Sequence, residues 1–264
     1  MTQHPIIIIG GGNMGGAIAS RWHSAHTGCV HVVEQDAARR KALSALGITT
    51  HALLEHAPLA ASYLLAIKPQ QFAENSAEFR HIMLDRAPLL ISIMAGVPLA
   101  ALSKISPRAV RVMPNLPALI GESMSVACAP ELDATSRKTV TMLFDAIGTT
   151  AWVDSEAQLH AVTAISGSGP AYVFAFMEAL QQAAIDAGLA PGLAAQLVTK
   201  TVRGAALLAD QSSVDIAMLR AQVTSKGGTT EAALNAFAEA KLEQLVGRAV
   251  KAAAARSKAL ANGS

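Results

Sequence analysis

The sequence predicts an α/β protein, in which a Rossmann-type doubly wound parallel sheet over residues 1–155 is followed by an all-α domain over residues 156–264. In the first part, short runs of β-branched residues alternate with amphipathic stretches, as strands and helices do in successive βαβ units. The first of these runs ends in a glycine motif. From about Glu156 the strand-like runs give way to long stretches rich in Ala and Leu, which favour helices.

Five apolar runs in the first part have the length and composition of buried parallel strands. They cover Ile6–Ile9, Val30–Val33, Tyr63–Ile67, Leu89–Ile93 and Ala109–Met113. The helices expected between them cover Met14–Ser24, Ala37–Leu46 and Gln71–His81. Two later runs, Ser125–Ala129 and Thr150–Val153, are expected to add edge strands.

The glycine motif directly follows the first predicted strand, because Gly10, Gly12 and Gly15 form a GxGxxG pattern where strand gives way to helix. In this pattern the first glycine makes a tight turn, the second lets the backbone approach a pyrophosphate, and the third lets helix pack on strand. The free N–H groups of the helix then hold the pyrophosphate. We therefore expect a dinucleotide to bind here, rather than a glycine-rich turn of some other fold. The binding segment also contains Gly11, Asn13 and Met14.

An acidic residue, Glu34, ends the second predicted strand about 20 residues past the glycines, where such a side chain accepts hydrogen bonds from the adenosine ribose hydroxyls. A carboxylate there should repel a 2′-phosphate and favour NADH. Arg39 and Arg40 follow closely and could supply the opposite preference, so the choice between NADH and NADPH stays open. The alternative is that these side chains are simply solvated.

A second cofactor segment is expected at the end of the Tyr63–Ile67 run. Open α/β sheets place ligand-binding residues outside the carboxyl ends of their strands, and Pro69 would stop this strand cleanly. The expected contacts come from Ala66, Ile67, Lys68 and Pro69. Alternatively, Lys68 is a solvated charge at the end of a strand.

The helical part is expected to contain four long helices, interrupted by turns. They cover Tyr172–Ala187, Gly192–Asp210, Val214–Val223 and Thr230–Lys258. Ser166–Pro170 is expected to form a tight turn ahead of the first of them.

The turn over residues 224–230 is the most informative one in the helical part. Its two glycines precede a helix, so free N–H groups near the helix start would form an anion site that suits a small carboxylate. The alternative is that Thr229 and Thr230 only cap their own helix.

Composition excludes several classes of protein. With 52% hydrophobic and 15% charged residues, the chain has far more apolar material than a disordered protein. The surplus of apolar, Ala-rich helices indicates surface that a homo-oligomer would bury. The formal net charge is +2 and no run of like charges occurs, so we expect no nucleic-acid partner.

Membrane and metal partners are not expected either. No stretch reaches the roughly 18 uninterrupted apolar residues that span a bilayer, and the N-terminus lacks the cationic segment of a signal peptide, so we expect a cytoplasmic protein. The eight histidines form no metal-binding pair. Cys29 and Cys128 lie far apart in the sequence without the spacing of metal ligands, so we expect them to be free cysteines. The residues therefore indicate a dinucleotide enzyme for a small anionic substrate, without a metal or a covalent nucleophile.

Five segments, in this order and with these separations, closely resemble the pyrroline-5-carboxylate reductase family. They are GGGNMG, AIKPQ, RVMPNLPALIG, SGSGPAY and VTSKGGTTEAAL. Together they extend over nearly the whole chain. The last is the most specific, because it is similar to the family's own signature, whereas the glycine motif is shared by many dehydrogenases.

The resemblance implies hydride transfer from NADPH or NADH to the C=N carbon of 1-pyrroline-5-carboxylate, giving L-proline in the last step of proline biosynthesis. It also implies a homodimer with interlocking helical domains, in some members assembled further, in which the partner's helices help to complete each active site. Thr230 would be the catalytic residue, hydrogen-bonded to the developing amine. The substrate would be bound by Ser225, Gly227, Gly228, Thr229 and Thr230, and Ile93, Met94 and Ala95 would join residues 66–69 in lining the cofactor.

The chain departs from the family's pattern at two places that would contact the cofactor. Leu116 stands where the family often has Thr, and Thr50–Leu53 lacks the Asn commonly found there.

Two other interpretations of the function remain open. A β-hydroxyacid dehydrogenase would need Asn four residues after its catalytic lysine, but Gly204 holds that position after Lys200. A non-catalytic NAD(P)H redox sensor would have no need of an anion-binding Gly-Gly-Thr-Thr turn.

Overall fold

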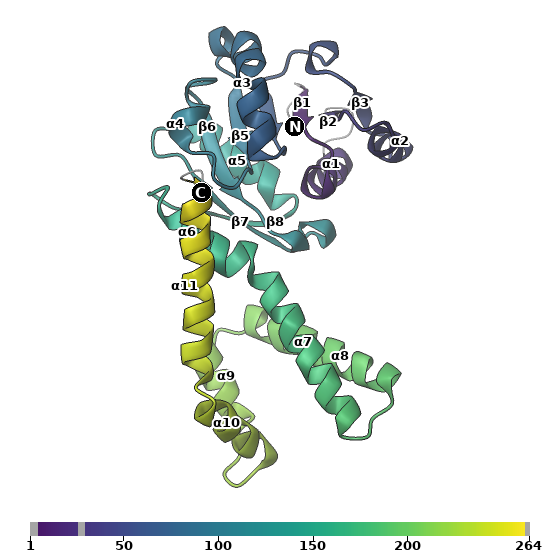
Figure 1. The fold of residues 1–264 in the computed structure, drawn as a ribbon, viewed down its shortest axis with the longest axis vertical. Helices are drawn as coiled ribbons and strands as arrows, with labels where there is room; N and C mark the ends of the chain where they lie inside the picture. Colours follow the sequence, from purple (N-terminus) through teal and green to yellow (C-terminus); the bar gives the residue numbers. More distant parts are fainter. Residues whose placement is uncertain (1–4, 26–29, 262–264) are drawn as a thin grey trace. The chain divides into compact units, whose positions relative to one another are not determined.

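The computed structural model describes residues 5–25 and 30–261, and Cys29 therefore lies outside the described residues. The chain divides into two compact units (Figure 1). The sheet unit comprises Met1–Ser168 together with Ala252–Ser264, and the helical unit comprises Gly169–Lys251. The domain boundary expected between residues 155 and 156 remains a prediction.

The described part of the sheet unit contains one eight-stranded sheet with the order β3-β2-β1-β4-β5-β6-β7-β8 (Figure 1). Its strands are β1 (Ile6–Ile9), β2 (Val30–Val33), β3 (Thr49–His51), β4 (Ser62–Leu65), β5 (Leu89–Ser92), β6 (Ala109–Met113), β7 (Ser123–Cys128) and β8 (Gly148–Trp152). Neighbours are parallel, except that β7 runs antiparallel to β6. The order from β3 to β6 is that of a doubly wound sheet, which confirms the predicted fold class.

Helices cover both faces of this sheet. They are α1 (Asn13–Ala25), α2 (Ala37–Ala45), α3 (Pro69–Met83), α4 (Leu99–Leu102), α5 (Ala134–Asp145) and α6 (Gln158–Val162), with short 3₁₀ turns at Leu54–His56, Leu84–Arg86 and Leu116–Ile120. Ile6 and Ile8 of β1 belong to one buried cluster and Ile7 and Ile9 to the other, because alternate side chains point to opposite faces. Burial on both faces explains why the strands read as unbroken apolar runs.

The sequence missed β3 and placed the ends of other strands inaccurately. β3 is a three-residue edge strand with the polar sequence Thr-Thr-His, which carries little strand signal. β4 ends at Leu65 rather than Ile67, because Ala66 and Ile67 leave the strand to form a loop. β7 begins at Ser123 and β8 at Gly148, two residues earlier than expected in each case.

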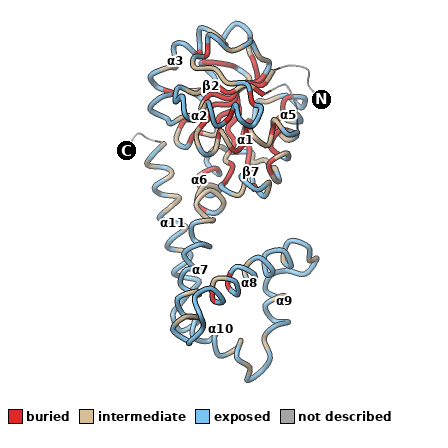
Figure 2. Tube along the Cα trace, turned by 90° about the vertical axis from the view of Figure 1, so that its right-hand side faces the viewer, coloured by how far each residue is buried: buried red, intermediate tan, exposed pale blue. Residues whose placement is uncertain are grey.

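The helical unit has little core of its own. It contains α7 (Gly169–Asp186), α8 (Pro191–Gln211), α9 (Ile216–Gln222), α10 (Thr229–Glu239) and the first half of α11 (Leu242–Ala261), up to Lys251. Among the described residues of this unit, only Ala194 and Val198 are buried, and Figure 2 shows its helices as largely exposed. Large apolar side chains such as Phe174 and Ile216 are exposed on them. A single copy of the unit thus leaves much apolar surface in contact with water.

Two predictions about the helical part are wrong. The single helix expected over Thr230–Lys258 is two helices, because α10 ends at Glu239 and Lys241 turns into the left-handed region at φ 55°. The break contains neither Gly nor Pro, so the usual signal for a helix end is absent. The tight turn expected at Ser166–Pro170 is also absent. A π-helical turn covers Thr163–Gly167, and α7 begins at Gly169.

None of the helices in residues 5–25 and 30–261 has both the length and the apolar character needed to cross a lipid bilayer.

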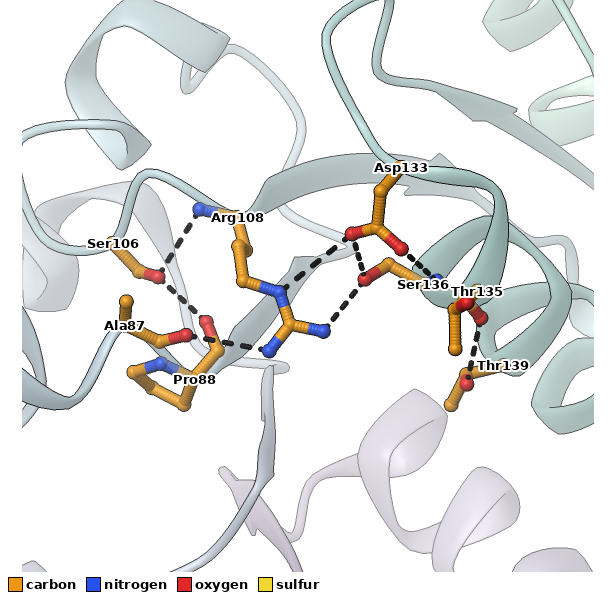
Figure 3. Close-up of polar contacts among 8 residues, drawn as sticks. All are labelled: Ala87, Pro88, Ser106, Arg108, Asp133, Thr135, Ser136 and Thr139. Carbon is orange, nitrogen blue, oxygen red and sulfur yellow. Dashed lines mark hydrogen bonds and ion pairs between the residues drawn. The ribbon is translucent and has the colours of Figure 1, made fainter.

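A polar cluster around Arg108 ties the start of α5 to the segments that lead into β5 and β6 (Figure 3). Its guanidinium donates to Ser136 Oγ at 2.6 Å and to the carbonyl of Ala87 at 3.4 Å. Asp133 caps α5 by accepting from the N–H of Ser136 at 2.8 Å, and its carboxylate also lies 3.9 Å from Arg108 Nε. The Ser136 hydroxyl bond lowers the pKa of Asp133 most, so the cap stays charged at neutral pH.

A stacked pair of histidines joins β2 to β3. The rings of His31 and His51 lie 5.3 Å apart, with Nδ1 of His31 3.0 Å from Nε2 of His51. Partial burial lowers the pKa of both residues below 6.5, and neighbouring histidines lower it further, His51 for His31 and His56 for His51. The folded protein therefore favours the neutral pair.

We expect the free energy of unfolding to fall as the pH drops from 7.5 to 5.5. The unfolded histidines take up protons near pH 6.5, but the folded pair takes them up only at lower pH, so acid favours the unfolded state. Urea unfolding measured across this range checks the prediction. The double variant His31→Gln, His51→Gln should show a shallower decline, with His81→Gln on the exposed face of α3 as the matched control. An equal slope in the double variant would contradict this role of the pair.

Candidate dinucleotide site and substrate loop

A cavity of about 420 Å³ opens at the carboxyl ends of β1, β2 and β4 in the sheet unit. The chain order of the strands reverses between β1 and β4, which is where doubly wound sheets bind ligands. Of the residues predicted to bind cofactor, the cavity is lined by Gly10, Gly12, Asn13, Glu34, Ala66, Ile67 and Lys68. The structure thus brings three separate predicted segments to one cavity.

The three motif glycines each meet a different steric demand. Gly10 has φ 104°, and a Cβ there would lie 2.6 Å from the carbonyl oxygen of Ala66. A Cβ on Gly15 would lie 2.0 Å from the carbonyl oxygen of Gly10, so only glycine lets α1 start this close to β1. A Cβ on Gly12 would meet only Arg39, at 3.7 Å. The backbone at Gly12 is therefore open to an approaching ligand.

Glu34 is fixed to the glycine loop. Its side chain is 10% exposed, and Oε2 accepts from the N–H of Gly11 at 2.8 Å. Oε1 accepts from the N–H of Asp36 at 2.9 Å, and Arg39 Nη1 lies 3.8 Å from Oε2. Two backbone donors thus hold the carboxylate at the cavity wall.

The cationic side chains of the β2–α2 segment are differently placed. Arg40 Nη1 donates to the carbonyls of Glu34 and Gln35 at 2.8 and 2.6 Å. Arg39 lines the cavity with a side chain that is 57% exposed. Asp36 caps α2 by accepting from the N–H of Arg39, and this bond lowers the pKa of Asp36.

The loop after β4 forms the opposite wall. The N–H of Ala66 donates to the carbonyl of Ile9 at 2.8 Å, which continues the β1–β4 ladder into the loop. α3 begins at Pro69, and the side chain of Gln71 accepts from the N–H of Lys68 at 3.1 Å. Lys68 is exposed at the cavity, and it forms no ion pair within the described residues.

The other predicted cofactor residues do not line this cavity. Gly11 is buried in the loop, Gly15 is buried in the first turn of α1, and Met14 packs against the core. Ile93, Met94 and Ala95 follow β5, the neighbour of β4, so they lie at the same edge of the sheet. Met94 is buried, whereas Ala95 is exposed. Their contact with a cofactor remains a prediction.

Sequence reasoning missed part of the cavity wall. Ala52, Leu53 and Leu54 line the cavity because they follow β3, the strand that was not predicted. Of these three, Leu54 lies outside the Thr50–Leu53 stretch that the resemblance placed near the cofactor. Gln71 and Asn75 reach the cavity from the first turns of α3. A helical period on the predicted Gln71–His81 helix places these two on one face, but nothing local shows which face meets the cavity.

Asn115, which lies in the RVMPNLPALIG segment, forms a structural junction. Its Nδ2 donates to the carbonyl and hydroxyl of Ser166 at 3.2 Å, and its Oδ1 accepts from the N–H of Met124 at 3.0 Å. The MPNLP and SGSGP segments are thereby joined within the sheet unit. Leu116 beside it is exposed.

In the helical unit, the predicted anion loop leads directly into α10. Gly227 has φ 72°, and the N–H of Gly228 donates to the carbonyl of Ser225 at 3.0 Å to close a turn. Glu231, from the first turn of α10, accepts from the N–H of Gly227 at 2.7 Å. The backbone of the loop is therefore held in shape from within the unit.

The threonines do not cap their own helix. The N-cap of α10 is Gly228, so the prediction of a threonine N-cap is wrong. Thr229 is exposed and Thr230 half-buried, and neither side chain makes a hydrogen bond within residues 5–25 and 30–261. Both hydroxyls are therefore available to a ligand.

Comparison with known proteins separates the chain into two matched regions. Residues 156–260 match the family model described as pyrroline-5-carboxylate reductase dimerisation, and residues 5–96 match the one described as NADP oxidoreductase, coenzyme F420-dependent.

Several curated relatives are similar over most of their length. Pyrroline-5-carboxylate reductase of Haemophilus influenzae is 37% identical over 264 residues, 97% of each chain. That of Pseudomonas aeruginosa is 41% identical over 202 residues, 75% of this chain and 74% of the relative. Among solved structures, a pyrroline-5-carboxylate reductase from Coxiella burnetii has a TM-score of 0.91 at 32% identity, covering 98% of this chain and 99% of that one. The Plasmodium falciparum pyrroline carboxylate reductase, solved with NADP bound, has a TM-score of 0.82 at 28% identity and covers 97% and 99%.

Proposed function

This chain belongs to the pyrroline-5-carboxylate reductase family, and we propose that it reduces 1-pyrroline-5-carboxylate to L-proline with NADPH or NADH. It is an NAD(P)H-dependent oxidoreductase that acts on a cyclic C=N bond. The observation that best supports this proposal is that one chain combines a glycine-built dinucleotide cavity with a Ser225–Thr230 loop whose hydroxyls make no hydrogen bond within residues 5–25 and 30–261.

The cavity suits a dinucleotide in its detail. The Gly11 N–H is occupied by Glu34, so the pyrophosphate would be held by the N–H groups of Gly12 and Asn13 at the start of α1. Glu34 keeps further lone pairs for the adenosine ribose hydroxyls. The residues from Ala66 to Pro69 and from Ile93 to Ala95 would line the remainder of the cofactor. When bound, the nicotinamide supplies the hydride.

The substrate loop fits a small carboxylate. The N–H groups at the start of α10, together with the Ser225 hydroxyl and the turn at Gly227 and Gly228, would bind the carboxylate. The Thr230 hydroxyl would hydrogen-bond the ring nitrogen. A protonated cyclic imine is already an electrophile, so the protein's task is mainly to align it and to stabilise the nitrogen as it becomes an amine. This explains a site without a strong acid or base.

The protein is a homo-oligomer with a small-molecule substrate. We propose that the exposed apolar faces of α7–α11 form the subunit interface of a homodimer, since one copy leaves them uncovered. Light scattering would separate a dimer from a larger assembly. A cytoplasmic location remains a prediction that cell fractionation would check.

The proposed reaction is tested by following nicotinamide absorbance at 340 nm with the purified protein, 1-pyrroline-5-carboxylate, and NADH or NADPH in parallel. We expect oxidation of the cofactor that depends on the imine and yields proline. A parallel reaction with NAD⁺ and 3-hydroxyisobutyrate tests the β-hydroxyacid interpretation and should give no turnover. If both cofactors bind but neither is consumed with the imine, the reductase proposal fails and a redox sensor becomes the better interpretation.

A further inference from the structure

We propose that Glu34 makes this chain select NADH over NADPH, by placing a fixed carboxylate where a 2′-phosphate on the adenosine ribose would have to bind. The inference rests on the proposed dinucleotide site. It goes further, because neither the sequence nor membership of the family decides between the two cofactors.

The first support is the rigidity of the carboxylate. The N–H groups of Gly11 and Asp36 each donate to one oxygen of Glu34, at 2.8 and 2.9 Å, and the side chain is 10% exposed. To move away from a 2′-phosphate, Glu34 would have to leave both backbone donors unpaired, one of them in the buried glycine loop. A free ribose needs no such movement, since its hydroxyls donate to the remaining lone pairs.

The second support is the charge around that carboxylate. Asp36 is a second anion, and it occupies the start of α2, where N–H groups would otherwise be free for a phosphate. The guanidinium of Arg40 donates to the carbonyls of Glu34 and Gln35, at 2.8 and 2.6 Å. Arg39 is the remaining cation of this segment at the cavity, and its guanidinium lies 3.8 Å from Glu34. A phosphate dianion would therefore meet the carboxylate of Glu34 and compete with it for Arg39, and it would find Asp36 already bound at the start of α2.

The test uses two fragments that lack nicotinamide, ADP-ribose and 2′-phospho-ADP-ribose, titrated by calorimetry into the full-length protein. We expect wild-type protein to bind ADP-ribose at least about tenfold more tightly than 2′-phospho-ADP-ribose. The reason is that the repulsion between the Glu34 carboxylate and the 2′-phosphate is only partly screened at a half-buried site. NADH and NADPH should show the same order of dissociation constants. The two fragments undergo no reaction. If the reductase proposal were wrong, the turnover assay would therefore show it, whereas the relative affinity for the two fragments would not change.

Three variants locate the effect. Glu34→Gln keeps an acceptor for the Gly11 N–H but loses the charge. It should therefore lower the ratio of the dissociation constants of 2′-phospho-ADP-ribose and ADP-ribose by about tenfold, toward equal binding. Glu74→Gln, an exposed charge change on α3 outside the cavity, should leave the ratio unchanged. Arg39→Gln should not selectively weaken the phosphorylated fragment. Thermal melts of each variant check that the fold is retained.

Specific results would overturn the proposal. Equal binding of the two fragments by wild-type protein, or tighter binding of 2′-phospho-ADP-ribose, contradicts NADH selection whether or not the variants fold. A wild-type preference that survives in Glu34→Gln removes the role from Glu34. If Arg39→Gln selectively weakened the binding of 2′-phospho-ADP-ribose, Arg39 would be the residue that binds the 2′-phosphate. Failure of both fragments and both cofactors to bind would refute the cofactor site itself, and this inference with it.

Discussion

Replacing Thr230 with alanine is expected to lower kcat by about 10–200-fold, the equivalent of a lost charge-assisted hydrogen bond of about 1.5–3 kcal/mol. The Thr230 hydroxyl makes no hydrogen bond within the described residues, so its removal leaves no internal partner unsatisfied. The fold of α10, whose N-cap is Gly228, should be unaffected. The loss should therefore fall on the reaction rather than on stability.

Two further substitutions separate the hydroxyl from the shape of the side chain. Thr230→Ser keeps the hydroxyl and should retain most of the activity, whereas Thr230→Val keeps the shape and should be as impaired as the alanine variant. Steady-state kinetics at saturating cofactor, with NADH binding measured separately, gives the comparison. If Thr230→Ala keeps kcat within roughly twofold of wild type, the hydroxyl does not take part in the chemical step.

Alanine at Gly15 and at Gly12 should impair dinucleotide binding in two different ways. At Gly15 the new Cβ would lie 2.0 Å from the carbonyl oxygen of Gly10, so the glycine loop and α1 must separate. We expect this to lower the free energy of unfolding by about 1–3 kcal/mol and to abolish dinucleotide binding. At Gly12 the Cβ meets only Arg39 at 3.7 Å, so the fold should survive while the approach of the pyrophosphate is blocked.

Urea unfolding and NADH titration, measured on both variants, distinguish the two effects. Gly16→Ala is the matched control within the same helix, because its Cβ would lie 3.3 Å from the carbonyl oxygen of Gly11 and needs only a small adjustment. Gly12→Ala is expected to match wild type in stability and to bind NADH at least about tenfold more weakly. Normal NADH binding by Gly12→Ala would mean that the pyrophosphate does not pass over this glycine.

Much of the secondary structure of the sheet unit could be predicted from the sequence, because it depends on residues that are close together in the chain. β1, β2 and β6 have the predicted ends because runs such as Ile6–Ile9 are buried on both faces and bounded by a loop. The glycine motif predicted its own geometry for the same reason. The positive φ at Gly10, the start of α1 at Asn13 and the close contact of Gly15 with the carbonyl of Gly10 are properties of a few adjacent peptides.

The features that were missed depend on partners far away in the chain. β3 forms because Thr49–His51 pairs with β2 at the sheet edge, not because these polar residues favour a strand. The break at Lys241 carries no Gly or Pro to announce it. The threonine cap was a reasonable local inference, but Gly228 already fills that position, which leaves the hydroxyls of Thr229 and Thr230 uncommitted.

By itself, the sequence determined the fold class and the glycine loop, since each depends on local backbone preference or on a motif, and it predicted the residues of the substrate loop. Only the tertiary structure decided what Glu34 does. Its carboxylate binds the N–H of Gly11, 23 residues away, because β1 and β2 are neighbours in the sheet. The same neighbour relations brought Leu54 and Asn75 to the cavity wall. Contacts of this kind depend on the order of strands, which no short segment encodes, whereas turns and buried strands depend on their own residues.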